Sequence, residues 1–318
     1  MSYGYMPWGI PDGTKLLNAT EPRALAKQIH DLGGYVFFAH TEEPRDWDLP
    51  ELSGMEIYNI HSNLKKLPGK GDVYARLAPD MILSTRSYPE HVMRKIFERQ
   101  TKILARWDEA NVTRKVVGIA GNDCHQNNGL VARYTEEGTL NLGKTSPGDT
   151  IAEWKLNAVT RLLLRACFGK LEPGKQLFRV DFDAYERSVR FVNTHVLAHE
   201  LTEKDILGAI TEGRVFIAFD MIADARGFKY LARTGGKTAV MGETIPFGSD
   251  TQLEAESPVP CRFAVVHDGV YGEKQEGRVF TLRLDKPGKY RLEAELNVMN
   301  EWIPWVYTNP IEVVAPKS

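Results

Sequence analysis

The sequence has few cysteines, no long apolar run and almost no net charge, and each scarcity excludes a class of protein. Its three cysteines, Cys124, Cys167 and Cys261, are far apart and odd in number. They indicate no disulfide framework, so a reducing compartment is the simpler expectation. No stretch approaches the ~18 apolar residues of a membrane-spanning helix. The formal net charge of −2 gives no reason to expect nucleic acid or an anionic membrane as a partner.

The first residues also lack a feature that would direct export. Residues 1–8 have no charged region followed by an apolar core, as a signal peptide would. We therefore expect a cytoplasmic protein, with the reservation that a longer precursor could be exported.

The pattern of apolar residues divides the 318 residues into two predicted domains. In residues 1–227, stretches of helical periodicity alternate with short apolar runs, which predicts an α/β domain with a parallel sheet. The predicted helices cover residues 20–33, 90–108, 151–168 and 202–213. The predicted strands cover residues 35–39, 52–59, 116–120, 178–182, 191–197 and 213–219. Residues 228–318 show short alternating strands between Gly and Pro turns, which predicts a small Ig-like β-sandwich.

Polar residues follow two of the predicted buried strands. His40 comes directly after residues 35–39, and Asp123 and His125 come after residues 116–120. On a continuing strand, Asp123 and His125 would project to one side and Cys124 to the other. A carboxylate beside an imidazole suits a divalent metal ion. The alternatives are a polar turn at the strand end for Asp123 and His125, and a histidine bound to a backbone carbonyl for His40.

Other ionisable residues are weaker indicators of a functional site. Glu56 lies inside an apolar strand, where an unpaired carboxylate is costly, so it needs a cation, a metal-bound water or a backbone donor. His61 is either an exposed loop residue or part of the site. His195 and His199 are four residues apart, but the first falls in a strand and the second precedes a helix, so a structural role is favoured over metal binding.

Three motifs in this order resemble those of a known family. They are Ala39-His40, the strand Gly54-Met55-Glu56-Ile57-Tyr58-Asn59, and Gly121-Asn122-Asp123-Cys124-His125. Together they resemble the PHP (polymerase and histidinol phosphatase) superfamily of metal-dependent hydrolases, in its carbaryl-hydrolase-like branch with a C-terminal β-domain.

The resemblance implies a fold and a metal centre. The fold would be a distorted (βα)7 barrel of the TIM-like kind, followed by the β-sandwich. His40, Asp123 and His125 would bind divalent metal, either Zn, Mn or Fe and of uncertain number. Glu56 and His61 would assist catalysis, and Gln126 would orient ligands. The family's opening His-x-His and Thr-Asp-His motifs are absent from this sequence, so the predicted barrel is N-terminally incomplete.

The implied activity is hydrolysis of phosphoesters or related small-molecule esters by a metal-activated water. The alternative is a degenerate, non-catalytic PHP-like protein that serves for binding or as a scaffold. We expect no nucleic-acid or membrane partner. An incomplete barrel would leave exposed sheet edges, which predicts a homo-oligomer or a partner that covers them.

Overall fold

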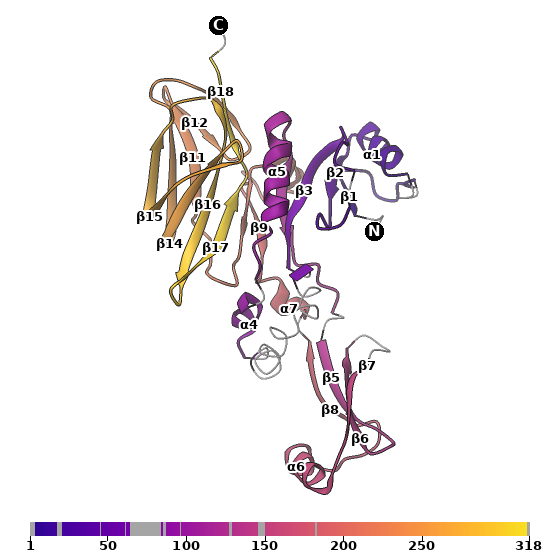
Figure 1. Cartoon of the computed structure of the whole chain (residues 1–318). Helices are drawn as coiled ribbons and strands as arrows, with labels where there is room; N and C mark the ends of the chain where they lie inside the picture. Colours follow the sequence, from indigo (N-terminus) through magenta and orange to yellow (C-terminus); the bar gives the residue numbers. More distant parts are fainter. Residues whose placement is uncertain are drawn as a thin grey trace. The chain divides into compact units, whose positions relative to one another are not determined.

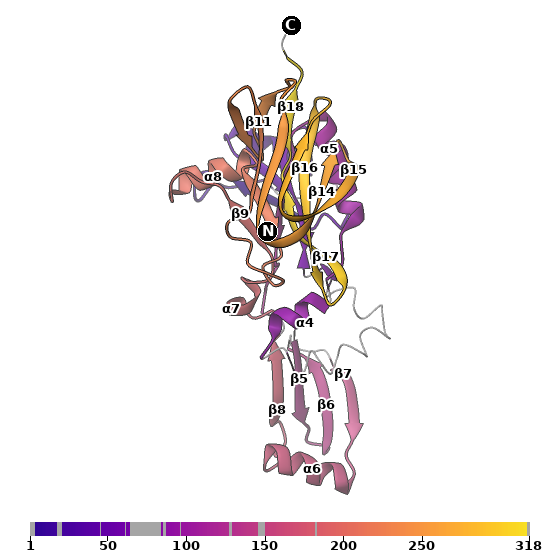
Figure 2. The same ribbon diagram turned by 90° about the vertical axis from the view of Figure 1, so that its left-hand side faces the viewer.

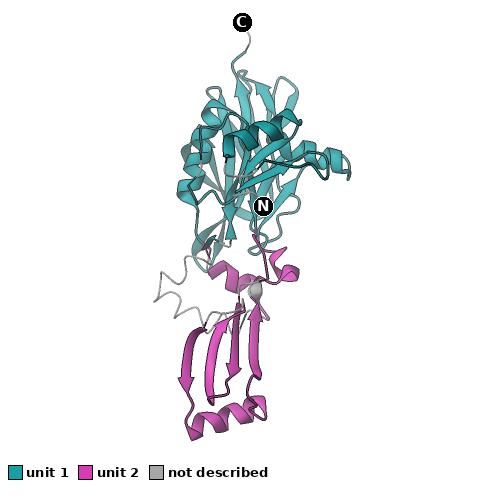
Figure 3. Ribbon diagram, turned by 90° about the vertical axis from the view of Figure 1, so that its right-hand side faces the viewer, with its two compact units in different colours: residues 1–62, 98–121, 192–318 teal, residues 63–97, 122–191 magenta. Residues whose placement is uncertain are grey.

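The computed structural model describes residues 4–17, 21–44, 46–60, 62–63, 84, 87–95, 97–126, 129–145, 150–181 and 183–316. The chain divides into two compact units, shown in Figure 3. Unit 1 comprises residues 1–62, 98–121 and 192–318, and unit 2 comprises residues 63–97 and 122–191. Unit 2 therefore consists of two separate segments of the chain.

The N-terminal part of unit 1 is a four-stranded sheet, called sheet A here. Its strands are β1 (Tyr5–Trp8), β2 (Tyr35–Phe38), β3 (Leu52–Asn59) and β4 (Val117–Gly121), in the order β1-β2-β3-β4. Strands β2, β3 and β4 are parallel, whereas β1 is antiparallel to β2. Helix α1 (Pro22–Asp31) precedes β2, and helix α5 (Thr101–Thr113) precedes β4. The carboxyl ends of β2, β3 and β4 therefore lie at one edge of the sheet.

The rest of unit 1 is a ten-stranded sheet, called sheet C, drawn from salmon to yellow in Figure 1. Its strands are β9 (Asn193–Val196), β10 (Val215–Ala218), β11 (Lys229–Thr234), β12 (Lys237–Val240), β13 (Thr244–Pro246), β14 (Gln252–His267), β15 (Val270–Arg283), β16 (Gly288–Val298), β17 (Glu301–Thr308) and β18 (Ile311–Val314). Helix α8 (Glu203–Thr211) connects β9 to β10. The central path is β12-β11-β14-β16-β17-β10-β9; β15 pairs with β14, and β18 with both β13 and β16. Side chains such as Phe216, Phe263, Leu292 and Trp305 form its apolar core.

Two polar side chains, the buried Asn309 and the half-buried Thr194, join sheet A to sheet C. The Asn309 amide accepts a hydrogen bond from Gly118 N at 2.8 Å and donates to the carbonyls of Gly118 at 2.9 Å and Val215 at 3.0 Å. The Thr194 hydroxyl accepts from Ala120 N at 3.0 Å and donates to the same residue's carbonyl at 3.2 Å. These bonds satisfy backbone groups on the open edge of β4, which would otherwise lack partners.

A buried ionic network holds α5 against sheet C, beside which it runs in Figure 1. The Arg291 guanidinium, which is 2% exposed, forms two bonds to Asp108 of α5, at 2.6 and 2.7 Å, and one to Glu293 at 2.6 Å. Glu293 also binds Arg99 and the Tyr271 hydroxyl. These charges hold the pKa of Glu293 below its usual value against the opposing effect of burial. Arg291 and Glu293 lie on the face of β16 that packs against α5. This contact accounts for the charged side chains on that face.

Unit 2 contains a second four-stranded sheet, called sheet B, whose strands are all antiparallel. Its order is β7-β6-β5-β8, formed by β5 (Gly129–Tyr134), β6 (Thr139–Lys144), β7 (Thr150–Lys155) and β8 (Gln176–Asp181). The helices of the unit are α4 (Pro89–Lys95), α6 (Ala158–Phe168) and α7 (Tyr185–Ser188). Within the described ranges of the whole chain, no helix is long and apolar enough to cross a membrane.

The predicted (βα)7 barrel of the TIM-like kind is wrong. The structure is 43% strand and 21% helix, and the described residues contain six helices. The physical reason lies in the pairing of the strands: β5–β8 pair antiparallel with one another, and β9 and β10 join the antiparallel C-terminal strands. The domain boundary predicted at residues 227 and 228 stays a prediction, and residues 228–318 lie in unit 1 with sheet A.

The predicted helix over residues 151–168 is also wrong in its first half. Residues 150–155 form β7, and the helix begins at Ala158 after the Asn157 side chain caps it by accepting from Thr160 N at 2.9 Å. Cys167 is exposed on this helix.

Candidate functional site

The edge of sheet A where β2, β3 and β4 end carries the polar side chains of the first and second motifs. His40 lies two residues beyond β2, with a backbone φ of +51°. Its N–H donates to Glu56 Oε2 at 2.9 Å. Few residues other than glycine adopt this left-handed conformation, and it is often found at functional sites. Here it directs a backbone donor at the carboxylate of the neighbouring strand.

Glu56 lies in β3 and is only 7% exposed. Its Oε2 atom also accepts from the Asn59 amide at 3.1 Å. Burial raises the pKa of Glu56 to about 7, and the hydrogen bonds from His40 and Asn59 oppose that rise. Of the three partners considered from the sequence, the structure shows a backbone donor, supplemented by a side-chain amide.

The other oxygen of Glu56 lies beside the end of β4. A Cβ atom added to Gly121 would come within 2.7 Å of Glu56 Oε1. The hydrogen bonds that the Glu56 side chain receives from described residues reach Oε2. The absence of a side chain at Gly121 is what allows Oε1 to lie this close to the end of β4.

A second carboxylate lies next to His40. Glu42 Oε1 is 3.4 Å from His40 Nδ1, and both side chains are about one-fifth exposed, at 19% and 23%. Glu42 Oε2 is buried and has no hydrogen-bond partner within the described part of the chain. The intervening Thr41 donates from its hydroxyl to the Glu56 carbonyl at 2.6 Å, which ties this turn to β3. The edge thus combines one imidazole with two carboxylates.

The third motif lies in unit 2, after the end of β4. Asp123 and His125 occupy a loop rather than a strand, and Asp123 has a backbone φ of +48°. Their side chains are nevertheless adjacent, with His125 Nδ1 3.3 Å from Asp123 Oδ1. The prediction that strand alternation brings them together is therefore wrong, although the two side chains do meet.

The sequence did not single out the residue that holds this loop. Asp183, 4% exposed, accepts from His125 N at 3.2 Å, and its carbonyl accepts from the Cys124 thiol. Burial raises the pKa of that thiol. Asp183 is 58 residues from its partner His125, and no spacing rule relates residues so far apart.

His40 and Glu56 belong to unit 1, whereas Asp123 and His125 belong to unit 2. The predicted site residues therefore form two groups, one in each unit. His61 lies outside the described residues. Among the residues that are described, no group of three or more His, Cys, Asp or Glu forms a metal-binding cluster.

The two other histidines weighed as ligands have separate partners. His195 Nε2 is 2.9 Å from Asp220 Oδ2, whose carboxylate also accepts from Asn193, whereas His199 Nε2 is 2.9 Å from Arg214. They do not face one another, and the structural role favoured for them stays the simpler interpretation.

Comparison with known proteins gives the chain no relative from which a function could be read. No protein-family model, no curated protein and no solved structure matches it.

Proposed function

We propose that the chain is a metal-dependent hydrolase of phosphoesters or related esters, with His40 and Glu56 in its site. The observation that carries this proposal is the arrangement of Glu56. Two donors hold its Oε2, its Oε1 lies close against Gly121, and burial raises its pKa to about 7. A carboxyl group that titrates near neutrality can both accept and donate a proton in a reaction at that pH.

The side chains at this edge of sheet A suit a divalent cation. Imidazole and carboxylate together are ligands for Zn, Mn or Fe. The buried Oε2 of Glu42, without a partner among the described residues, is an oxygen that a cation would satisfy. A bound ion of this kind lowers the pKa of a coordinated water toward neutrality. His40 and Glu42 would hold the ion, and Glu56 would take up the proton at Oε1.

Asp123 and His125 stay proposed ligands on the strength of their motif. In unit 2 their side chains lie 3.3 Å apart, and Asp183 fixes the loop that carries them. An adjacent carboxylate and imidazole are the donors this role needs. Asp183 would then be a positioning residue that acts through the loop backbone.

The test is metal analysis of the purified chain together with hydrolysis assays. We expect bound Mn, Zn or Fe, and metal-dependent turnover of p-nitrophenyl phosphate or a p-nitrophenyl carboxylate ester. Asp123→Ala should abolish turnover and lower the metal content. Glu56→Gln should lower kcat while the metal stays bound, because the amide cannot take up the proton.

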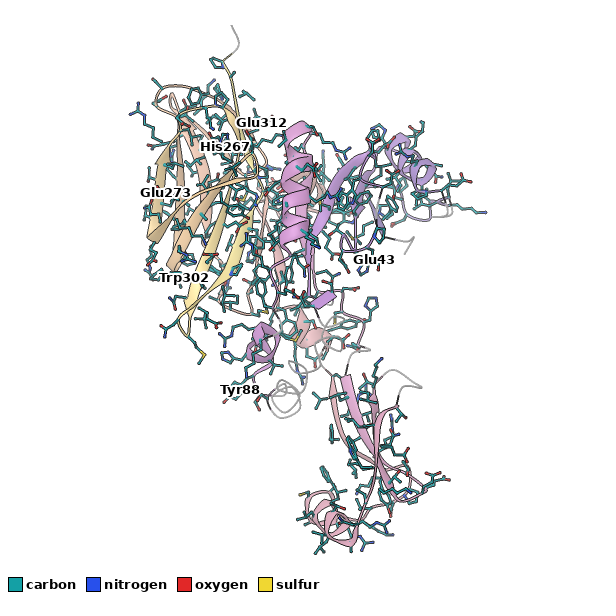
Figure 4. All side chains as sticks on the ribbon, in the orientation of Figure 1. Glu43, Tyr88, His267, Glu273, Trp302 and Glu312 are labelled. Atoms are coloured by element: carbon teal, nitrogen blue, oxygen red, sulfur yellow. The ribbon has the colours of Figure 1, made fainter. Side chains whose placement is uncertain are left out.

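The control is Glu273→Ala, an exposed residue of β15 labelled in Figure 4, which should leave metal content and turnover unchanged. A chain without metal and without turnover would contradict the proposal and favour a binding or scaffold protein. Full activity in Asp123→Ala would mean that Asp123 is not a ligand.

A further inference from the structure

Unit 1 contains a pocket at the end of β4 that is opposite to the candidate site. Its walls come from the end of α5, the start of β4, the turn before β10, the turn after β12, and the strands β16 and β18. The buried Val117 lines it and begins β4, whereas Gly121, beside Glu56, ends that strand. The pocket is therefore separate from the site proposed above.

The size of the pocket limits what it can hold. The space open to the centre of a water-sized sphere is about 40 Å³. One water needs ~10–15 Å³ of such space, so about three fit. That is close to the size of one phosphate or sulfate ion and far below that of a nucleotide. The lining residues Lys115 and Thr244 are exposed, so the pocket opens to solvent.

Two ammonium groups reach this pocket without a counter-ion. Lys115 Nζ donates to the Gly242 carbonyl at 2.7 Å, and Lys289 Nζ donates to the Arg114 carbonyl at 3.1 Å, which joins β16 to the neighbouring α5 (Figure 2). Neither lysine forms an ion pair with a carboxylate of the described residues. Desolvation lowers the pKa of Lys115, and the charge of Lys289 lowers it further, against the opposing effect of nearby glutamates. The two cations therefore act on one another.

Two of those glutamates have other partners. Glu212 pairs with Arg214 at 3.2 Å, and Glu243 accepts from the Val240 N–H at 2.9 Å. Neither of them lines the pocket. Their charges act on Lys115 from a distance and leave its ammonium group without a bonded anion.

Glu312, labelled in Figure 4, is the one carboxylate among the described residues that line the pocket. Its Oε2 accepts from the Thr244 hydroxyl at 3.3 Å. The lining thus carries two positive charges and one negative charge, with the negative charge already hydrogen-bonded.

Two glycines fix the position of Lys115. A Cβ atom added to Gly213 would lie 3.3 Å from Gly242 Cα and 3.6 Å from Lys115 Cε, and one added to Gly242 would lie 2.3 Å from the Glu212 carbonyl. Both glycines have a positive φ, of +77° and +83°, which other residues rarely adopt. The two turns can therefore meet, with the Lys115 stem beside one and its ammonium group bonded to the other.

We propose that this pocket binds a small divalent oxyanion, of the size of inorganic phosphate, between Lys115 and Lys289. Two ammonium groups match two negative charges, and hydrogen bonds between charged groups are stronger than those between neutral ones. The ion would be the counter-ion that the described carboxylates do not supply. This inference does not depend on the proposed hydrolase activity.

The test is calorimetric titration of the full chain with inorganic phosphate at pH 8, where phosphate is largely a dianion. Chloride keeps the ionic strength constant, and a chelator removes metal ions. We expect saturable binding with a dissociation constant on the order of 1 mM. Sulfate should bind comparably, and the monovalent acetate should bind at least about fivefold more weakly.

The variants Lys115→Met and Lys289→Met keep most of each apolar stem and remove its charge. Each should weaken phosphate binding at least about tenfold. They approach the pocket from different walls, so either one tests the proposal if the other fails to fold. Glu312→Gln should tighten binding by about two- to fivefold, because it removes the negative charge from the lining. The control is Lys237→Met, at an exposed position of β12, which should bind as the wild type does.

Three results would overturn the inference. The first is a wild-type chain without saturable phosphate binding up to about 50 mM. The second is acetate binding as tight as that of phosphate, which would contradict the match of two charges. The third is unchanged binding in both lysine variants or weaker binding in Glu312→Gln, either of which would show that the ion binds outside this pocket.

Discussion

Glu56 carries a carboxyl group that burial keeps protonated to an unusually high pH. Its pKa is raised from 4.5 to about 7, mainly by desolvation. Between these two values the native chain binds a proton that the unfolded chain has released, so the free energy of unfolding falls as the pH rises. This single residue therefore makes the metal-free protein less stable at pH 8 than at pH 4.5.

Glu56→Gln should remove that dependence. With a chelator present, the variant and the wild type should have similar stability near pH 4.5, and the variant should be more stable by roughly 3 kcal/mol at pH 8. Urea denaturation at intervals across this range measures the difference. Glu273→Gln, at an exposed position of β15, should follow the wild type. Parallel curves for Glu56→Gln and the wild type would show that this carboxyl has an ordinary pKa.

Gly121 gives a second prediction at the scale of the residue. Gly121→Ala would place a methyl group 2.7 Å from Glu56 Oε1. Because Glu56 is buried and held at its other oxygen, we expect overpacking to lower the free energy of unfolding by about 1–2 kcal/mol. Urea denaturation at pH 6 measures this loss.

The matched control is Gly208→Ala in α8, where an added Cβ has no atom within 4 Å. There the substitution should be neutral or stabilise by about 0.5–1 kcal/mol, since alanine is the better helix former. Equal changes in the free energy of unfolding at the two positions would mean that the Glu56 side chain moves away from the new methyl group without cost.

The sequence predicts some elements well because local chemistry determines them. Thr202 caps α8 by accepting from Asp205 N at 3.2 Å, and Asp205 accepts in return from the N–H groups of His199 and Glu200. The helix predicted over residues 202–213 begins at this cap. Strands β2 and β3 likewise lie within the ranges predicted for them, residues 35–39 and 52–59.

Other elements depend on partners that a local pattern does not reveal. Trp154, Ala158 and Leu162 recur at helical spacing, yet residues 150–155 form a strand because they pair with β6. Tertiary pairing overrides a helical period in so short a segment. The same holds for the site: the motifs predicted that Glu56 needs a partner, but the His40 backbone donor depends on a left-handed turn that no periodicity shows.

Helix α5 illustrates an element held in place by charge. Asp108 and Arg291 are 183 residues apart and form a buried bidentate pair. Asp108→Ala would leave Arg291 buried without its main partner, and we expect a loss of about 3–5 kcal/mol in the free energy of unfolding. The measurement is denaturation in urea, followed by circular dichroism.

The double variant Asp108→Leu/Arg291→Met provides the comparison. Replacing both charges with apolar side chains removes the uncompensated guanidinium, and Arg99 and Tyr271 still bind Glu293, so the double variant should be more stable than Asp108→Ala alone. A double variant that is less stable than Asp108→Ala would mean that the bond from Arg291 to Glu293 outweighs the cost of burying the unpaired guanidinium.

At the scale of the whole molecule, the barrel prediction failed because it assumed that each strand is followed by a helix and another parallel strand. The chain instead leaves sheet A twice, after β3 and after β4, to form unit 2, and returns to unit 1 at α5 and β9. Only β2, β3 and β4 form a parallel set in sheet A. A pattern of alternating helices and apolar runs does not distinguish these arrangements, since the difference lies in the pairing of distant strands.

Asn309, which lies between β17 and β18, connects the C-terminal strands to β4. It is 1% exposed, and its amide makes the three bonds that connect β4 to β10. Asn309→Leu keeps the approximate volume but leaves the buried Gly118 N–H without its acceptor. Each lost bond to a buried backbone group costs about 1–3 kcal/mol, so we expect a large loss in the free energy of unfolding.

Hydrogen exchange gives the more specific measurement, because it reports on each amide separately. In Asn309→Leu the amides of Gly118 and neighbouring residues of β4 should exchange faster relative to those in the core of sheet C, such as Phe263. Glu273→Leu, at an exposed position of β15, should change neither. If protection falls equally in β4 and around Phe263, the two sheets unfold as one unit and Asn309 is one bond among many. A loss confined to β4 would identify Asn309 as the link through which the C-terminal strands stabilise the edge of the candidate site.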